Sequence, residues 1–210
     1  MTRYGVNRLG GTNDVRLAHF RRLRLERLKP LTPDYAMLPI LEGFNWAECL
    51  AKVDEVRLYL VVFRSVRRES ADPIRLKAYD DRAYEEARAA SGLLYYFRGA
   101  LTAGRQCLSF CVWESQEQAQ AATRLLAHEA AAHITDEMYV SFELERWILI
   151  KRSGSTRLKL RPVPSDTPQS RTLTSTPAQW KDGAWPGIDM SGAGTTELGF
   201  PSTGGADAAG

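Results

Sequence analysis

Two side chains in this sequence have the chemistry of an acid–base site. His133 falls on the apolar face expected for a helix over residues 115–134, where an imidazole can take a proton from a bound substrate. Arg64 lies within an apolar strand and can stabilise the phenolate or enolate that this proton transfer leaves. The alternative is that both residues have structural roles. His133 would then be a core histidine whose hydrogen bonds are made within the protein, and Arg64 would form an ion pair with Glu143 or Glu145.

Aromatic side chains accompany these two residues in the neighbouring elements. We predict that they line a substrate pocket between helix and sheet, and they are Tyr79, Tyr95, Phe97 and Trp113. His128 is expected on the solvent side of the same helix as His133. Cys49, Cys107 and Cys111 have no metal-ligand spacing and are interpreted as free thiols. The sequence contains no phosphate-binding glycine loop, metal quartet or hydrolase triad.

The elements that would position these residues follow from hydrophobic periodicity. The period changes from two to about 3.6 at Ser115, which can cap the following helix by accepting the Gln118 N–H. Strands are expected over 58–67, 93–98, 106–113 and 139–150, and helices over 74–90 and 115–134. The order β-α-β-β-α-β predicts a ferredoxin-like α+β fold, with a four-stranded antiparallel sheet and both helices on one face.

The second face of this sheet also needs cover, because the strands carry apolar residues on both sides. Pairing two sheets into a dimeric barrel would provide it, so we predict a homodimer. The alternative is that the N-terminal extension or the C-terminal tail folds back over its own sheet.

Composition divides the chain into three parts. Residues 1–56 form a basic extension with a short helix from Trp46, residues 57–152 form the α+β domain, and residues 153–210 form a Gly/Ser/Thr/Pro-rich, largely disordered tail. Residues 1–30 hold eight Lys/Arg against two acids. This arm is expected either to bind an acidic protein, an anionic membrane surface or nucleic acid, or to be a solvated extension that packs on its own domain or on a neighbouring subunit. Residues 158–164 can extend the last strand.

The chain is expected to be soluble and cytoplasmic. No apolar run reaches the length of a transmembrane segment, and the arginine-rich beginning is not followed by the apolar stretch of a signal peptide.

Three local patterns together carry a family resemblance. They are Val62-Phe63-Arg64-Ser65 on the first strand, Tyr79 on the first helix, and Val112-Trp113-Glu114-Ser115 followed by His128. Over residues 57–151 the chain resembles the antibiotic biosynthesis monooxygenase-like domain. This resemblance implies a dimeric α+β barrel, within a superfamily of cofactor-free oxygenases of polycyclic phenols, quinol-type oxygenases, haem-degrading enzymes and proteins without known activity.

The resemblance implies cofactor-independent monooxygenase chemistry with no bound cofactor. Haem is a secondary alternative, because the haem-degrading branch relies on a first-strand Asn and a helical Trp and His. Here the first strand has no Asn, Ala122 occupies the Trp position and the His position falls next to His133. Two hypotheses remain: a dimeric barrel that binds, and can oxygenate, a small hydrophobic aromatic compound, or a non-catalytic scaffold that recruits partners through its two ends.

Overall fold

The computed structural model describes residues 22–164 and 170–172. Its α-helices are α2 (Trp46–Cys49), α3 (Pro73–Ala89), α4 (Gln116–Ala122), α5 (Leu126–His133) and α6 (Thr135–Met138), and its 3-10 helices are η1 (Leu25–Arg27) and η2 (Tyr35–Met37). Its strands are β1 (Val56–Arg67), β2 (Leu93–Phe97), β3 (Gln106–Trp113), β4 (Tyr139–Lys151), β5 (Leu158–Pro162) and β6 (Ser170–Thr172).

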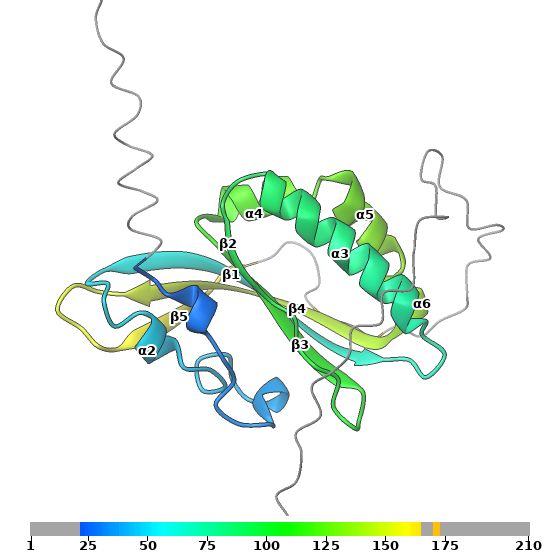
Figure 1. The fold of residues 1–210 in the computed structure, drawn as a ribbon, viewed down its shortest axis with the longest axis horizontal. Helices are drawn as coiled ribbons and strands as arrows, with labels where there is room; N and C mark the ends of the chain where they lie inside the picture. Colours follow the sequence, from blue (N-terminus) through cyan, green and yellow to red (C-terminus); the bar gives the residue numbers. More distant parts are fainter. Residues whose placement is uncertain (1–21, 165–169, 173–210) are drawn as a thin grey trace, which may run out of the picture. The chain divides into compact units, whose positions relative to one another are not determined.

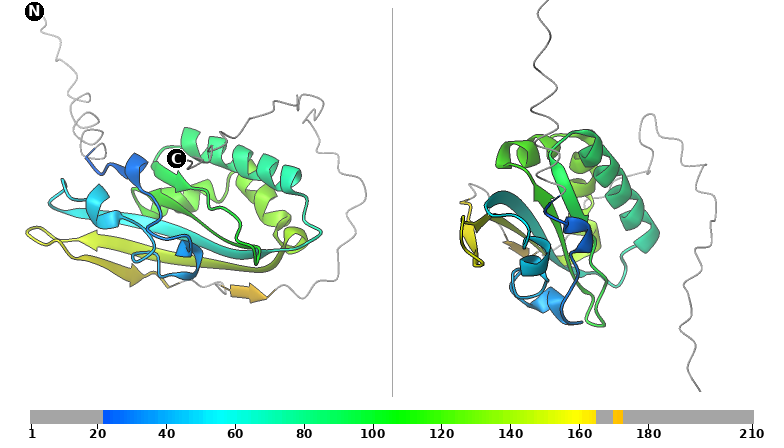
Figure 2. Two further views of the ribbon diagram at one scale, coloured as in Figure 1. Left: turned by 60° about the horizontal axis from the view of Figure 1, so that its bottom comes forward. Right: turned by 60° about the vertical axis from the view of Figure 1, so that its left-hand side comes forward.

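The strands form one antiparallel sheet in the order β2-β3-β1-β4-β5, and β6 pairs with another part of β4. The central four strands have the order of a ferredoxin-like sheet, so the predicted fold class is confirmed. Figure 2 shows β5 running beside β4 at one edge of the sheet. The sheet therefore continues past residue 152, where the sequence composition changes.

Local signals explain where α3 begins and ends. The Asp72 side chain accepts hydrogen bonds from the backbone N–H groups of Ile74, at 2.9 Å, and Arg75, at 3.1 Å. Pro73 occupies the first helical position, where a missing N–H costs nothing. Beyond the helix, Gly92 adopts φ +89°, a conformation that favours glycine.

The single helix predicted over 115–134 is wrong, because the structure breaks it into α4, α5 and α6. The predicted cap is present, since Ser115 Oγ accepts the Gln118 N–H. The chain then becomes extended at Leu125, with φ −81° and ψ 149°, and its side chain packs against the cluster that contains Ala119 and Ala122. The helical phase restarts at Leu126, which is 71% exposed. The buried and exposed sides of α5 therefore differ from those predicted for one continuous helix over residues 115–134.

The helices α3, α4, α5 and α6 lie on one face of the sheet (Figure 1). On this face Tyr59 and Val61 of β1 pack with residues of β3, β4 and α4. A second, smaller cluster joins Leu76 of α3 to Ile134 and Met138. Between these two clusters the helices and the sheet are less tightly packed, and this region contains the cavity described below.

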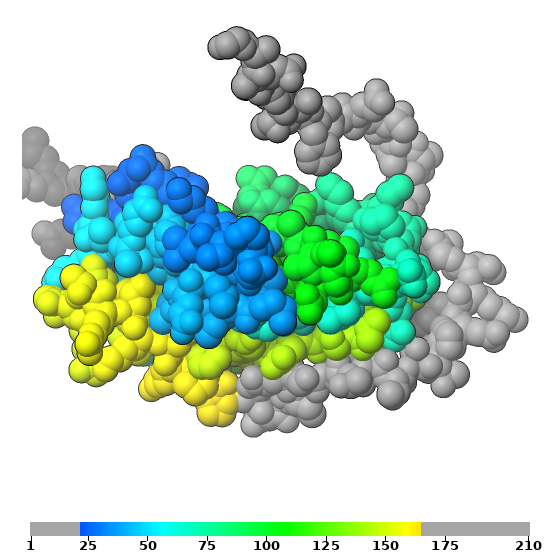
Figure 3. Space-filling view, turned by 90° about the horizontal axis from the view of Figure 1, so that it is seen from below, coloured from blue at the N-terminus to red at the C-terminus, as the bar shows by residue number. Residues whose placement is uncertain are grey.

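The opposite face is covered by residues 22–53 of the same chain. Leu58, Leu60 and Val62 of β1 alternate with the helix-facing residues and belong to a large buried cluster with this segment. The segment contributes Leu23, Leu25, Leu28, Tyr35, Ala36, Ile40, Phe44, Trp46, Cys49, Leu50 and Val53. In Figure 3 this segment, in blue, fills the middle of the face turned toward the viewer, between atoms coloured yellow and green. The chain thus provides the cover itself, as in the alternative of an N-terminal extension folded back, and a homodimer is not needed for this purpose.

Polar contacts also fix residues 22–53 to the sheet. The Lys151 ammonium is buried and donates to the carbonyls of Leu50, at 2.9 Å, and Val53, at 2.5 Å. Within the segment itself, Asn45 Oδ1 accepts the Lys29 N–H at 2.8 Å. These bonds satisfy backbone groups that an irregular segment would otherwise bury without partners.

No helix among residues 22–164 is long and apolar enough to cross a membrane. In the same part of the chain, no group of three or more His, Cys, Asp or Glu side chains is placed to hold a metal ion.

Candidate functional site

A cavity of about 550 Å³ lies between the helices α3 and α5 and the sheet. Its apolar lining includes Phe63, Leu76, Ala83, Ala87, Leu93, Ile134, Phe142 and Leu144. Its polar lining includes Ser65, Arg67, Lys77, Tyr79, Asp80, Tyr84, Tyr96, Arg98, Cys107, Ser109, Cys111, Thr123, His128, Thr135 and Tyr139. An apolar chamber with a few converging polar groups is the usual form of a small-molecule site.

One wall of the cavity is a charged network between α3 and β2. The Tyr96 hydroxyl donates to Asp80 at 2.7 Å, and Arg98 pairs with Asp80 at 2.6 Å and with Asp81 at 2.7 Å. Burial, followed by the charge of Asp80, raises the pKa of Tyr96 far above its usual value. The Tyr96 phenol therefore stays protonated and holds Asp80 in place.

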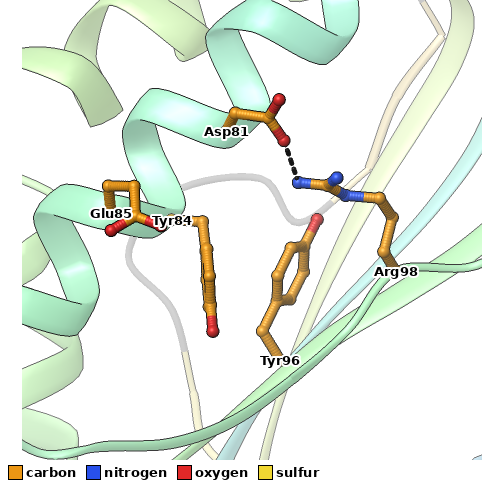
Figure 4. A pocket seen from close by; sticks show the side chains of 5 residues that line it. All are labelled: Asp81, Tyr84, Glu85, Tyr96 and Arg98. Carbon is orange, nitrogen blue, oxygen red and sulfur yellow. Dashed lines mark hydrogen bonds and ion pairs between the residues drawn. The ribbon is translucent and has the colours of Figure 1, made fainter. Parts of the chain in front are cut away.

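An outer hollow adjoins the cavity at this wall, because both are lined by Tyr84, Tyr96 and Arg98. Figure 4 shows the rings of Tyr84 and Tyr96 facing each other, with Arg98 reaching toward Asp81. The two ring centroids are 5.5 Å apart with an interplanar angle of 32°. A flat aromatic ligand entering from this side would meet two phenol rings and a guanidinium group.

His128 is the cavity residue best suited to accept a proton. Its Nδ1 atom is buried without a hydrogen-bond partner and lies 3.9 Å from the Glu86 carboxylate, which is too far for a hydrogen bond. Glu86 instead accepts the Ala127 N–H at 2.8 Å. Burial lowers the pKa of His128, and the charge of Glu86 offsets this only in part. His128 is thus a neutral imidazole at neutral pH.

Arg67 lines the cavity where β1 ends. Its Nε atom is buried without a hydrogen-bond partner. The pairing of β1 with β4 shifts its register between Val66 and Arg67, and Arg67 then pairs with Tyr139. Such bulges redirect side chains and are common beside functional sites. Burial raises the pKa of Tyr139 to about 12, so its hydroxyl remains a donor.

The cavity also contains two thiols of β3. Burial raises the pKa of Cys111 to about 12 and also raises that of Cys107. Cys107 donates to the Gly99 carbonyl at 3.4 Å. Since the thiolate is the nucleophile, neither cysteine is activated for attack.

Of the six predicted site residues, Tyr79 alone lines this cavity. Arg64 lies on the opposite face of the sheet, where it bonds Glu145 at 2.5 Å and the carbonyls of Ala36, at 2.6 Å, and Leu38, at 2.8 Å. The ion-pair alternative, with Glu145 as partner, therefore describes its contacts. Because strand residues alternate between faces, a residue four positions from Leu60 shares the face covered by residues 22–53.

The three remaining aromatic candidates also lie outside the cavity lining. Tyr95 and Phe97 pack against the cluster formed with residues 22–53, and the Phe97 ring stacks on Phe110 with centroids 5.2 Å apart. Trp113 is on the helix face, but it is 2% exposed and surrounded by the cluster that contains Ala119. These rings therefore fill cores and do not line the pocket.

His133 is exposed at the end of α5 and does not line the cavity. The break at Leu125 explains why His133 does not face the cavity as predicted. Leu126 and His133 are seven residues apart, which is about two helical turns, so both lie on the exposed side of α5. On the same helix His128 faces the cavity.

Sequence reasoning also missed Arg67, Asp80 and Tyr96. A partial signal was available for Arg67, because alternation along β1 places Ser65 and Arg67 on the face opposite the apolar Leu58, Leu60 and Val62. The sequence alone does not show which face of β1 keeps an open space.

The comparison with known families identifies the chain's relatives. A family model described as PB2B2.08-like matches residues 12–162. The chain belongs to the PB2B2.08-like family. This match includes all of residues 22–53 and β5 together with the ferredoxin-like core. No curated protein matches this PB2B2.08-like chain.

Solved structures similar to this PB2B2.08-like protein have low sequence identity. Protein SO0527 from Shewanella oneidensis is 14% identical, with a TM-score of 0.40, over 47% of this chain and 99% of that one. SnoaB, a cofactor-independent oxygenase from Streptomyces nogalater, is 11% identical, with a TM-score of 0.35, over 44% and 89%. A dimeric ferredoxin-like protein of unknown function from Thermobifida fusca is 18% identical, with a TM-score of 0.36, over 43% and 89%.

Proposed function

We propose that this PB2B2.08-like protein binds a small hydrophobic aromatic compound in the cavity between α3, α5 and the sheet. The cavity itself is the observation that carries this proposal, because it combines an apolar lining with the unpartnered nitrogen atoms of His128 and Arg67. Tyr84 and Tyr96 provide aromatic surface at its outer wall.

We further propose that the bound compound is oxygenated by dioxygen without a cofactor. The neutral His128 would remove a proton from an activated CH₂ group, and the resulting carbanion would pass electrons to dioxygen. The overall change is CH₂ plus O₂ to C=O plus H₂O, which balances. A dry cavity favours this route because it excludes competing protons.

Binding can be tested with 2-naphthol by isothermal titration calorimetry. Ala83 lines the cavity, whereas Ala121 is exposed on α4 and does not. We expect Ala83→Phe to abolish binding by filling the space and Ala121→Phe to preserve it. Equal affinity in both variants would show that the ligand binds elsewhere and would contradict the proposal.

Oxygenation can be tested by dioxygen uptake with anthrone, whose CH₂ group is acidified by its carbonyl. His128→Gln keeps a polar side chain but cannot act as a base, so uptake should fall by roughly 100-fold or more. His133→Gln is the matched control and should leave the rate unchanged. A similar rate in both variants would exclude His128 as the base while leaving ligand binding intact.

A homodimer remains a proposal for this protein, and native mass spectrometry of the full chain tests it. The dimer would have to form through surfaces other than the sheet face that residues 22–53 already cover. A mass of one chain would contradict it.

A further inference from the structure

Arg67 differs from the other arginines near the cavity in having no carboxylate partner. Arg98 pairs with Asp80 and Asp81, and Arg75 pairs with Glu137 at 2.5 Å. No carboxylate of the described residues lies within ion-pair distance of Arg67, and its Nε atom is buried without a hydrogen bond. A partly buried guanidinium without a counter-charge is unfavourable unless a ligand supplies one.

The charge of the cavity lining supports an anionic ligand. The lining contains Arg67, Lys77 and Arg98 but a single carboxylate, that of Asp80. Lys77 is paired with Asp81 at 2.6 Å, and Asp80 is engaged by Arg98 and Tyr96. Within the described part of the lining, Arg67 is the cation left to bind an anion.

Neutral donors surround Arg67 at this end of the cavity. Ser65 precedes it by two residues on the same side of β1, and Tyr139 is its partner on β4. The Arg67 charge acts on Tyr139, although burial keeps that phenol protonated. A carboxylate here can accept hydrogen bonds from the guanidinium, a phenol and a hydroxyl, and such charge-assisted bonds are strong.

The rest of the cavity extends from this end toward His128. Arg67 and Tyr139 lie beside the cluster containing Leu76, near the start of α3, whereas His128 lies beside Glu86, near its end. Leu76 and Glu86 are ten residues apart on α3, so the two ends of the cavity are about 15 Å apart along this helix. A flat ring system with its acidic group at Arg67 would therefore extend along the apolar lining toward His128.

We propose that Arg67 binds the carboxylate of the ligand, so that this cavity prefers an aromatic carboxylic acid to a neutral aromatic compound of the same shape. This inference rests on the proposed function, since it assigns the ligand class of the same cavity.

The test compares 2-naphthoate with methyl 2-naphthoate, its uncharged ester, by isothermal titration calorimetry on the full chain. The wild type should bind the carboxylate more tightly than the ester, on the order of 10- to 100-fold. Arg67→Gln should lose most of this preference while keeping its affinity for the ester, and Arg67→Lys should restore part of it. Arg68→Gln is the matched control with the same change in charge, because Arg68 does not line the cavity, and it should keep the preference.

The outcomes separate the two proposals. Equal binding of carboxylate and ester by the wild type, or an unchanged preference in Arg67→Gln, would overturn the carboxylate site while the binding cavity stands. Failure of both probes to bind would overturn the proposed function as well. Retained ester binding, together with an unchanged thermal midpoint, shows that Arg67→Gln still folds.

Discussion

The two faces of the sheet are formed by the same strands, but the segments that cover them pack differently. Residues 22–53 and the sheet enclose a dense cluster in which Phe44, Phe97 and Phe110 contact one another with centroids 4.9 to 5.2 Å apart. On the other face, α3 and α5 leave a cavity of about 550 Å³ that contains His128 and Arg67. One face stabilises the fold, and the other has room for a ligand.

This difference arises within single strands, because their side chains alternate between the two faces. Leu58, Leu60 and Val62 of β1 are 0 to 1% exposed, whereas Phe63 and Arg67, on the alternate side, line the cavity. Because neighbouring residues point to opposite faces, a substitution at one position can affect stability and the next can affect binding. Each of the following predictions tests that separation.

The largest expected effect is on the packed face. Phe110 is fully buried and contacts several aromatic rings, so Phe110→Ala should lower the free energy of unfolding by about 3–5 kcal/mol. Phe63 borders the cavity and is only partly buried, so Phe63→Ala should cost less than half as much. Chemical denaturation of both variants measures the difference. Equal losses would contradict the contrast between the two faces.

The second prediction compares two arginines of β1, one on each face of the sheet, in their effects on stability and on ligand affinity. Arg64→Gln removes hydrogen bonds to Glu145, Ala36 and Leu38 and should cost about 1–3 kcal/mol of stability. Its affinity for a cavity ligand should remain that of the wild type, since Arg64 lies on the other face. Arg67→Gln should show the reverse pattern. Denaturation and calorimetry on the same two variants decide between these roles, and weakened binding in Arg64→Gln would break the comparison.

The third prediction concerns pH and the cavity face. Burial lowers the pKa of His128 in the folded state below its ordinary value of 6.5. The unfolded chain therefore takes up this proton first as pH falls, so the contribution of neutral His128 to stability is complete above about pH 6.5 and decreases below it. Relative to the wild type, His128→Gln should lose less stability between pH 7 and pH 5. Parallel pH profiles of the two proteins would contradict a buried neutral imidazole.

Much of the fold could be predicted because strand and helix periods are local properties. The bounds of β3 match the predicted 106–113, and those of β1 and α3 agree to within a few residues. The break at Leu125 could not be predicted from periodicity, because Ala, Gln and Leu favour a continuous helix. Leu125 packs against a cluster that contains Tyr59 of β1 and Trp113 of β3, and this tertiary interaction overrides the propensity.

The site was harder to predict, because it depends on which spaces remain unfilled. Arg64, Tyr95 and Phe97 were selected for their chemistry, and they lie on the face that residues 22–53 cover. A strand pattern with apolar residues on both faces shows that both are covered, but it does not show by what. His128 and His133 exchanged places relative to the prediction because the helical phase restarts between Leu125 and Leu126.

The smallest expected effect distinguishes the faces by thiol reactivity. Burial raises the pKa of Cys49, on the packed face, to about 11, and it also raises the pKa of Cys107, in the cavity wall. Both should react slowly with a thiol reagent at pH 8, because little thiolate is present. A bound cavity ligand should slow Cys107 further, by shielding it, and leave Cys49 unchanged. Peptide mass spectrometry after timed labelling measures both sites. If 2-naphthol protects Cys49 as strongly as Cys107, then it stabilises the whole fold against opening and does not shield one wall, and the separation between a packed face and a ligand face would not hold for the thiols.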